Sequence, residues 1–299
     1  MQRHSIIAIG SLLGATLFWA GNYVLGAIAV AQVDPLSLVL LRWLIALVPL
    51  ALIAQIVERP DWRKVLRTWP WLIASSMLGL LGYNLLLYAA LAHTTPFNAS
   101  LINAFNPALI AVAAAVLLRE RLGRRGVIGV LLALIGVLIV LTDGDVARLL
   151  GDGFGPGELL MLGAIVVWST YTIVGRMGPK VPPITATAIQ AAITVAVLAP
   201  ISIATGGPTL PDSQVGLWSL LFIAVFPSVL SYLLWNRALV TLPASAAGVF
   251  MNLITVYIAI FTIISGQQYS AAQLIGGVVV ISGVVLTNAG ALKFLRRAR

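Results

Sequence analysis

Long apolar runs, broken at intervals by short polar or charged stretches, dominate the hydrophobic pattern of this chain. A helix needs about 20 predominantly apolar residues to cross the hydrocarbon core of a bilayer. Charges and Gly/Pro clusters separate runs of about that length. We expect ten membrane spans, at residues 5–30, 35–57, 70–92, 96–118, 126–142, 157–177, 183–205, 215–237, 243–265 and 271–294. The last two are divided at SGQQYSAAQ, because residues 238–292 carry no charge and are long enough to cross twice.

The composition agrees with this pattern. Of the 299 residues 60% are hydrophobic and only 9% are charged, whereas a soluble domain has about 25% charged residues. The absence of cysteine excludes disulfides and thiolate chemistry. We therefore predict an all-α integral membrane protein of ten transmembrane helices, with the lipid bilayer as its surroundings.

The net charge of +9 would suit a nucleic-acid ligand, but the positions of the charges favour another explanation. Short loops rich in Lys and Arg stay in the cytoplasm. With a cytoplasmic amino terminus, every basic residue except Arg42 and Arg148 lies on the cytoplasmic side. The charge therefore indicates topology, and we expect no nucleic-acid partner and two cytoplasmic termini.

The amino-terminal segment, MQRHS followed by an apolar stretch that ends in AVA at 29–31, resembles a cleavable signal peptide. Its uncharged run is far longer than the roughly 7–15 residues of a signal h-region. Cleavage would also remove one copy of the repeat described next, so we expect the segment to be retained.

The two halves of the chain align at an offset of 148 or 149 residues, with TLFWAGNYVLG at 16–26 over IVVWSTYTIVG at 165–175. Each half holds an odd number of spans, so the second half should be inverted relative to the first. We expect two five-helix repeats, at residues 1–145 and 155–295. Inverted repeats are typical of secondary transporters, whose substrate site lies near the bilayer midplane between the halves.

Several motifs, in this order, resemble a known family. Pro107 lies in the fourth span, LRERLGRRGVIG occupies 118–129, and an LxxxGVxxV pattern follows in the fifth span. Together with two five-helix halves they resemble the EamA family of the drug/metabolite transporter superfamily, and most of all its bacterial aromatic amino-acid exporters of YddG type. The resemblance covers essentially the whole chain. It implies a basket of ten helices, a central cavity lined by spans 1, 3, 4, 6, 8 and 9, a bacterial inner membrane, and no cofactor.

Aromatic and amide side chains near the middle of spans are the candidate substrate-binding residues. Trp19 and Trp168 occupy matching spans, and Asn22 and Tyr171 share their helix faces three residues further on. We expect these residues to wall a cavity for an amphipathic substrate, with packing between the halves as the alternative. The other candidates, for which hydrogen bonding between helices is the alternative, are Tyr83, Asn103, Asn106, Ser228, Tyr232 and Asn252.

Two features of the spans bear on chemistry. Pro107 cannot donate to the carbonyl of Asn103, and a freed carbonyl at membrane depth needs a partner or a water-filled cavity. Arg42 is the one charge inside a span, and it could neutralise a substrate carboxylate. It lies roughly 10 Å from the outer end of its span, close enough to snorkel. Its counterpart Gln190 is also polar, so we favour a structural role.

All nine acidic residues lie in loops or at span ends. This arrangement disfavours cation efflux and proton exchange on a carboxylate. Without a buried acid, Cys or His base, an intramembrane hydrolase is equally hard to build, and two histidines cannot form a metal site alone. We therefore expect no enzyme and no metal.

These observations predict an inner-membrane exporter of neutral amphipathic metabolites, above all amino acids including aromatic ones, that works by alternating access. A broad-specificity exporter of drugs or other metabolites is the alternative within the same class. A non-transporting membrane assembly or receptor subunit is the alternative from another class. The exact substrate, the coupling ion and the oligomeric state stay open, and a monomer is compatible with the sequence.

The orientation can be tested by cysteine labelling, since the chain has no native cysteine. Single cysteines near residues 63, 122 and 179 should be protected from an impermeant maleimide in intact cells. Single cysteines near 148 and 212 should be labelled. Labelling at residue 63 from outside would contradict the predicted orientation.

Overall fold

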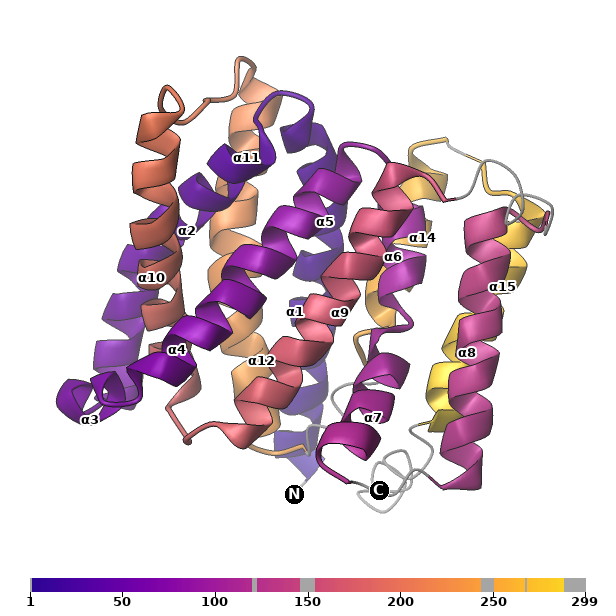
Figure 1. Cartoon of the computed structure of the whole chain (residues 1–299), viewed down its shortest axis with the longest axis horizontal. Coiled ribbons are helices and arrows are strands. Elements are labelled where there is room, and N and C mark those ends of the chain that lie inside the picture. The colour runs from indigo at the N-terminus through magenta and orange to yellow at the C-terminus, as the bar shows by residue number, and fades with distance from the viewer. Residues whose placement is uncertain (1, 120–122, 146–153, 243–249, 267, 288–299) are drawn as a thin grey trace.

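The computed structural model describes residues 2–119, 123–145, 154–242, 250–266 and 268–287, and this part of the chain is helical, without a β-strand (Figure 1). The helices are α1 (Gln2–Val30), α2 (Pro35–Ile53), α3 (Trp62–Leu66), α4 (Trp69–Ser75), α5 (Tyr83–Leu91), α6 (Pro96–Asn103), α7 (Asn106–Leu117), α8 (Arg124–Thr142), α9 (Pro156–Met177), α10 (Pro183–Ala204), α11 (Gln214–Val225), α12 (Ser231–Leu239), α14 (Leu253–Ile264) and α15 (Ala271–Thr287). Three π-helical turns continue or join them: η1 (Ala54–Glu58), η2 (Ser76–Gly82) and η4 (Phe226–Leu230).

Eight helical segments are long and apolar enough to cross a membrane. They are Ile6–Val30, Pro35–Glu58, Trp69–Leu91, Pro96–Leu117, Arg124–Thr142, Pro156–Met177, Pro183–Ala204 and Gln214–Leu239, and their ends lie within two residues of the predicted spans. Two shorter apolar helices follow, at Leu253–Ile264 and Ala271–Thr287.

Parts of the last two predicted spans, 243–249 and 288–294, lie outside the described residues, as do the loop positions 122 and 148. The structure therefore establishes a multi-pass helical membrane protein. The ten-helix count and the inversion of the halves stay predictions.

Local sequence explains where the helices begin. Pro35 and Pro96 start α2 and α6, positions at which the fixed φ of proline suits a helix and its missing N–H is not needed. Asp34 caps α2 by accepting a hydrogen bond from the Ser37 N–H at 2.9 Å. Partial burial acts to raise the pKa of Asp34, but hydrogen bonds from Ser37 and Thr209 hold that pKa below its ordinary value.

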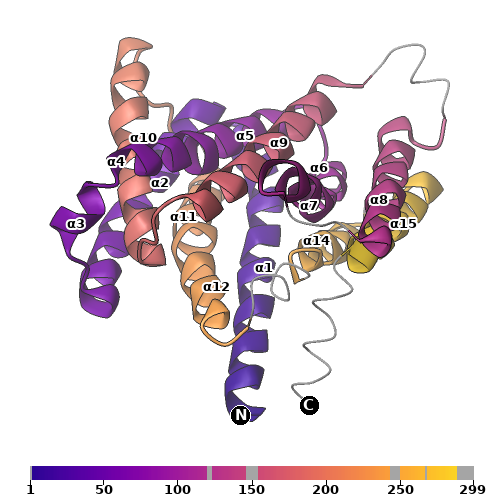
Figure 2. The ribbon, with the colours of Figure 1, turned by 60° about the horizontal axis from the view of Figure 1, so that its bottom comes forward.

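Helices from the first part of the chain pack mainly against helices from the second part. α1 packs against α11, α12 and α14, α2 against α10, α5 against α9, and α8 against α15. Figures 1 and 2 show the α2/α10 pair at one end of the molecule and the α8/α15 pair at the other, with the remaining helices between them. The interior of the protein is thus built from elements far apart in sequence.

Hydrogen bonds join α2 and α10 at both of their ends. The Glu58 carboxylate accepts from the backbone N–H groups of Ile184 and Thr185 at 2.9 and 2.7 Å, and so caps α10. At the opposite end, Thr209 donates from its backbone N–H to Ser37 Oγ at 3.0 Å. α2 is therefore attached to the start of α10 at one end and to the loop that follows α10 at the other.

Glycine allows α8 and α15 to approach closely. A Cβ built on Gly283 of α15 would lie 2.6 Å from the carbonyl oxygen of Gly129 in α8. One built on Gly276 would lie 2.9 Å from the carbonyl oxygen of Gly136. Small residues permit such backbone contact, which replaces the hydrophobic driving force that is missing between helices in lipid.

Gly283→Ala should force these two helices apart, at a cost of about 1–3 kcal/mol of stability, as overpacking usually does. Gly175→Ala is the matched control, because a Cβ there meets no atom within 4 Å. It should be neutral or slightly stabilising, since Ala favours a helix over Gly by roughly 1 kcal/mol. Apparent melting temperatures of both purified variants measure the difference, and equal values would contradict the close packing.

Candidate functional site

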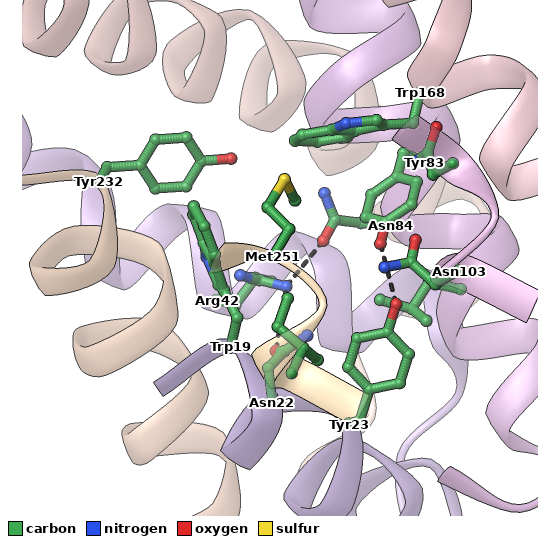
Figure 3. Close-up of a pocket in the computed structure, with 13 residues that line it drawn as sticks. Trp19, Asn22, Tyr23, Arg42, Tyr83, Asn84, Asn103, Trp168, Tyr232 and Met251 are labelled. Carbon is green, nitrogen blue, oxygen red and sulfur yellow. Dashed lines mark hydrogen bonds between the residues drawn. The ribbon is translucent and has the colours of Figure 1, made fainter. Parts of the chain in front are cut away.

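A central cavity lies between helices from both parts of the chain (Figure 3). α1, α2, α5, α6, α7, α9, α12 and α14 all contribute to its wall. The lining residues are Trp19, Asn22, Tyr23, Arg42, Tyr83, Asn84, Leu87, Asn103, Asn106, Trp168, Tyr232, Met251 and Ile254. The wall thus combines aromatic rings, uncharged amides and one guanidinium.

Most of the sequence-predicted candidates come together here: Trp19, Asn22, Tyr83, Asn103, Asn106, Trp168 and Tyr232 line the cavity. The other three lie behind the wall. Tyr171 contacts the Trp168 ring with centroids 5.2 Å apart, and Ser228 is fully buried. Asn252 is also buried, and its amide has no hydrogen-bond partner among the described residues.

The Arg42 guanidinium is bound by four neutral side chains. Nε and Nη2 donate to Ser228 Oγ at 3.0 and 2.8 Å. Nη1 donates to Asn84 Oδ1 at 2.7 Å, to the Tyr88 hydroxyl, and to Asn22 Oδ1 at 3.4 Å. Arg42 is only 3% exposed, so snorkelling is wrong: its partners hold the charge at the cavity instead of the membrane surface.

Proline in the second part of the chain positions one of these partners. Pro227 lies in η4 and has no N–H to donate to the carbonyl of Ile223, four residues earlier. The Ser228 hydroxyl donates to that carbonyl instead, at 2.6 Å. Since its proton is engaged there, Ser228 Oγ presents its lone pairs to Arg42.

A second π-helical turn, η2, positions Asn84 in the same way. The Asn84 amide nitrogen donates to the carbonyls of Leu80 and Gly79 at 2.7 and 3.3 Å. Both carbonyls belong to η2, where the widened turn changes the regular bonding pattern. The amide oxygen of Asn84 is therefore turned toward Arg42.

The helical segment Pro96–Leu117 is interrupted at the cavity, between α6 and α7. α6 ends at Asn103 and α7 begins at Asn106, with Pro107 as the next residue. Asn106 Oδ1 accepts a hydrogen bond from Ser169 Oγ at 2.9 Å. Asn103 Oδ1 is buried without a partner among the described residues. The sequence predicted only a freed Asn103 carbonyl, whereas the structure interrupts the helix here and brings two asparagines to the cavity wall.

Aromatic rings form two opposite walls. Tyr83 and Trp168 have ring centroids 4.7 Å apart, and Tyr171 extends this cluster behind Trp168. Trp19 and Tyr232 meet edge to face at 5.9 Å on the other side. In Figure 3 these two groups lie on either side of Met251.

The cavity is small in this conformation. Its free space is about 50 Å³, enough for roughly three or four water molecules. Hydrogen-bonded hydroxyls of Tyr23 and Tyr83, 3.2 Å apart, form part of its wall. A larger hollow of about 400 Å³ begins at Val24, the residue after Tyr23, between α1, α6 and α14. A ligand as large as an amino acid requires side-chain movement at the central cavity.

Sequence reasoning missed Tyr23, Asn84 and Tyr88, and it did not identify the hydrogen-bond partners of Arg42. A signal was present for two of them, because Asn84 and Tyr88 are four residues apart and therefore share one helix face at mid-span. Nothing in the sequence indicated that this face meets Arg42.

Apolar membrane spans around a central polar and aromatic cavity are typical of small-molecule membrane transporters. The chain belongs to the EamA-like transporter family, whose profile matches residues 6–142 and 155–289. A solved structure covers 97% of this chain and 99% of its own length with a TM-score of 0.64, at 21% identity, which supports the fold.

Most of the relatives to which the chain is similar are uncharacterised transporters. YyaM of Bacillus subtilis (strain 168) is 30% identical over 285 residues, which are 94% of this chain and 93% of the relative. A transporter of Archaeoglobus fulgidus is 28% identical over 295 residues, 96% of this chain and 98% of its own. The aromatic amino acid exporter YddG of Ancylobacter novellus is 32% identical over 187 residues, 61% of this chain and 62% of the exporter.

Tyr88→Phe should destabilise the protein, because the hydroxyl both accepts from Arg42 and donates to Asn22 Oδ1 at 2.8 Å. A buried polar group that loses its hydrogen-bond partner lowers the free energy of unfolding by about 1–3 kcal/mol. Tyr257→Phe is the control, since the hydroxyl of Tyr257 has no hydrogen bond to the described residues. Thermal unfolding in detergent should separate the two variants, and equal melting temperatures would mean that the network adds no stability.

Proposed function

We propose that this protein is an exporter of neutral amphipathic metabolites, above all amino acids including aromatic ones, in a bacterial inner membrane. The carrying observation is the composition of the central cavity. Aromatic rings offer contact to an apolar side chain, while Asn22, Asn103 and Arg42 offer hydrogen bonds to polar groups. The YddG relative is named an aromatic amino acid exporter, which supports this substrate class.

Alternating access between two inverted halves, 1–145 and 155–295, is the proposed mechanism. The helix contacts support it. The contact of α1 with α11 and α12 has a counterpart in that of α9 with α5 and η2, and the contact of α1 with α14 has one in that of α9 with α6 and α7. Exchanging the two halves turns α2 into α10 and α8 into α15, so the contacts α2/α10 and α8/α15 are their own counterparts. Two separate segments matched by the family profile agree with this division.

Two related halves in opposite orientations make inward-open and outward-open states similar in energy. The small central space then represents a state in which the cavity is largely filled by its own side chains. Movement of Tyr83 and Trp168, which pack against each other in one wall with centroids 4.7 Å apart, is the simplest way to admit a substrate ring.

Radiolabelled counterflow in proteoliposomes tests this function. Amino acids, nucleotides and hydrophobic cations should be offered as a panel, and we expect exchange of amino acids. Preferential exchange of hydrophobic cations would favour a drug exporter. Absence of exchange for every compound would favour a non-transporting membrane protein.

Trp19→Ala and Trp168→Ala should each reduce exchange of Phe more than exchange of Thr. An aromatic contact contributes about 0.5–1.5 kcal/mol beyond area burial, which corresponds to a roughly 2- to 12-fold effect. Exchange of Phe, Met and Thr should be measured beside the melting temperature of each variant. Early melting with wild-type substrate proportions would mean that the rings only pack.

A further inference from the structure

We propose that Arg42 binds the carboxylate of the transported molecule, so that the substrate class is carboxylates, with zwitterionic amino acids as its best-fitting members. This inference rests on the proposed function in taking the central cavity as the transport site.

The charge of Arg42 is the first argument. A guanidinium stays protonated in proteins, and a buried charge without a counter-ion is costly. Every hydrogen bond that the structure gives Arg42 goes to a neutral group. All acidic residues of the chain lie in loops or at span ends. The cavity wall therefore carries a positive charge that the described protein leaves uncompensated.

The second argument is unused donor capacity. Arg42 Nη2 carries two N–H groups and makes one hydrogen bond to the described residues, at Ser228. The Asn22 amide nitrogen makes none to them, while its oxygen accepts from both Arg42 and Tyr88. Both side chains line the cavity and lie next to each other in Figure 3. Two neighbouring donors, one of them charged, suit the two oxygens of a carboxylate.

The third argument is the opposite side of the cavity. Asn103 belongs to this side of the wall, and its amide oxygen is buried without a partner among the described residues. The rings of Tyr83 and Trp168 lie on the same side (Figure 3). An unengaged acceptor beside aromatic rings suits an ammonium group. Anion-binding and cation-binding groups thus face one space, as a zwitterion requires.

A purely structural Arg42 would tie α1, α2, α5 and η4 together with the same hydrogen bonds. The two roles differ in their effect on ligand selectivity. Isothermal titration of the purified full-length protein with three probes separates them: L-phenylalanine, 3-phenylpropionate, which lacks the ammonium group, and phenethylamine, which lacks the carboxylate. The wild-type protein should bind both carboxylates at least about tenfold more tightly than phenethylamine.

Asn22→Asp places a carboxylate beside the guanidinium and gives Arg42 an internal counter-ion. Binding of phenylalanine and phenylpropionate should weaken roughly 10- to 150-fold, while phenethylamine binds as before or more tightly, without a lower melting temperature. Arg42→Gln should also lose the preference for carboxylates over phenethylamine. If Arg42→Gln does not fold, the result for Asn22→Asp alone tests the proposal.

Asn98→Asp is the matched control. Asn98 lies in α6 and accepts from Gln273 Nε2 at 2.7 Å, away from the cavity wall. An acid there should leave the ratio of phenylalanine to phenethylamine affinity unchanged. Equal loss of carboxylate binding in Asn98→Asp and Asn22→Asp would overturn the proposal.

The remaining outcomes separate this inference from the proposed function. Binding of phenylpropionate without any amino acid would keep the carboxylate site and contradict amino-acid export. Phenethylamine binding as tight as that of phenylalanine would overturn the carboxylate site, even if counterflow shows amino-acid exchange. The carboxylate site would also be overturned if Asn22→Asp left the ratio of phenylalanine to phenethylamine affinity unchanged, or if none of the three probes bound.

Discussion

A guanidinium buried among membrane-spanning helices must find hydrogen-bond acceptors inside the protein, because lipid offers none. Arg42 obtains them from α1, α5 and η4, three elements that the sequence places far apart. Its flat faces are covered as well, with the Trp43 and Tyr88 ring centroids 4.9 and 5.6 Å from its central carbon. The charge is therefore the point at which the helices around the cavity are held in register.

Holding that charge requires local departures from regular helix. The Asn84 amide nitrogen binds the carbonyl of Leu80 in η2, and the Ser228 hydroxyl in η4 binds the carbonyl of Ile223, to which Pro227 cannot donate. The same two side chains then have fixed orientations, because one end of each is attached to its own backbone. A rigid acceptor stabilises a buried cation more than a mobile one does, because no conformational entropy is lost in ordering its side chain.

Much of the fold could be predicted from the sequence, because span ends are determined locally. Hydropathy and the positions of Pro35 and Pro96 define helix starts without knowledge of neighbours. The site was less accessible, since depth along a span does not reveal which faces meet. Counting residues left snorkelling open for Arg42, whereas in the structure its guanidinium donates to Ser228, 186 positions away. Asn84 was missed for a related reason, since nothing in the sequence shows that its helix face meets Arg42.

The aromatic candidates were easier to find, because Trp19 and Trp168 stand out against Leu and Val at mid-span. Their surroundings were not predictable from the sequence. Trp19 donates from Nε1 to the Pro227 carbonyl at 3.3 Å, whereas Trp168 packs between Tyr83 and Tyr171. Each tryptophan thus packs against a tyrosine of the other part of the chain, Tyr232 for Trp19 and Tyr83 for Trp168, and only the Trp19 side chain also makes a hydrogen bond to the described residues.

The fixed position of Arg42 also bears on what a transporter must keep out. Water has to enter the cavity whenever a substrate does, and a chain of water molecules conducts protons unless something interrupts it. A permanent positive charge in the wall repels hydronium and metal cations from the water beside it, as arginine does in water-selective pores. The residue that anchors the helices is thereby expected to let the protein move solutes without dissipating the ion gradients of the membrane in which it sits.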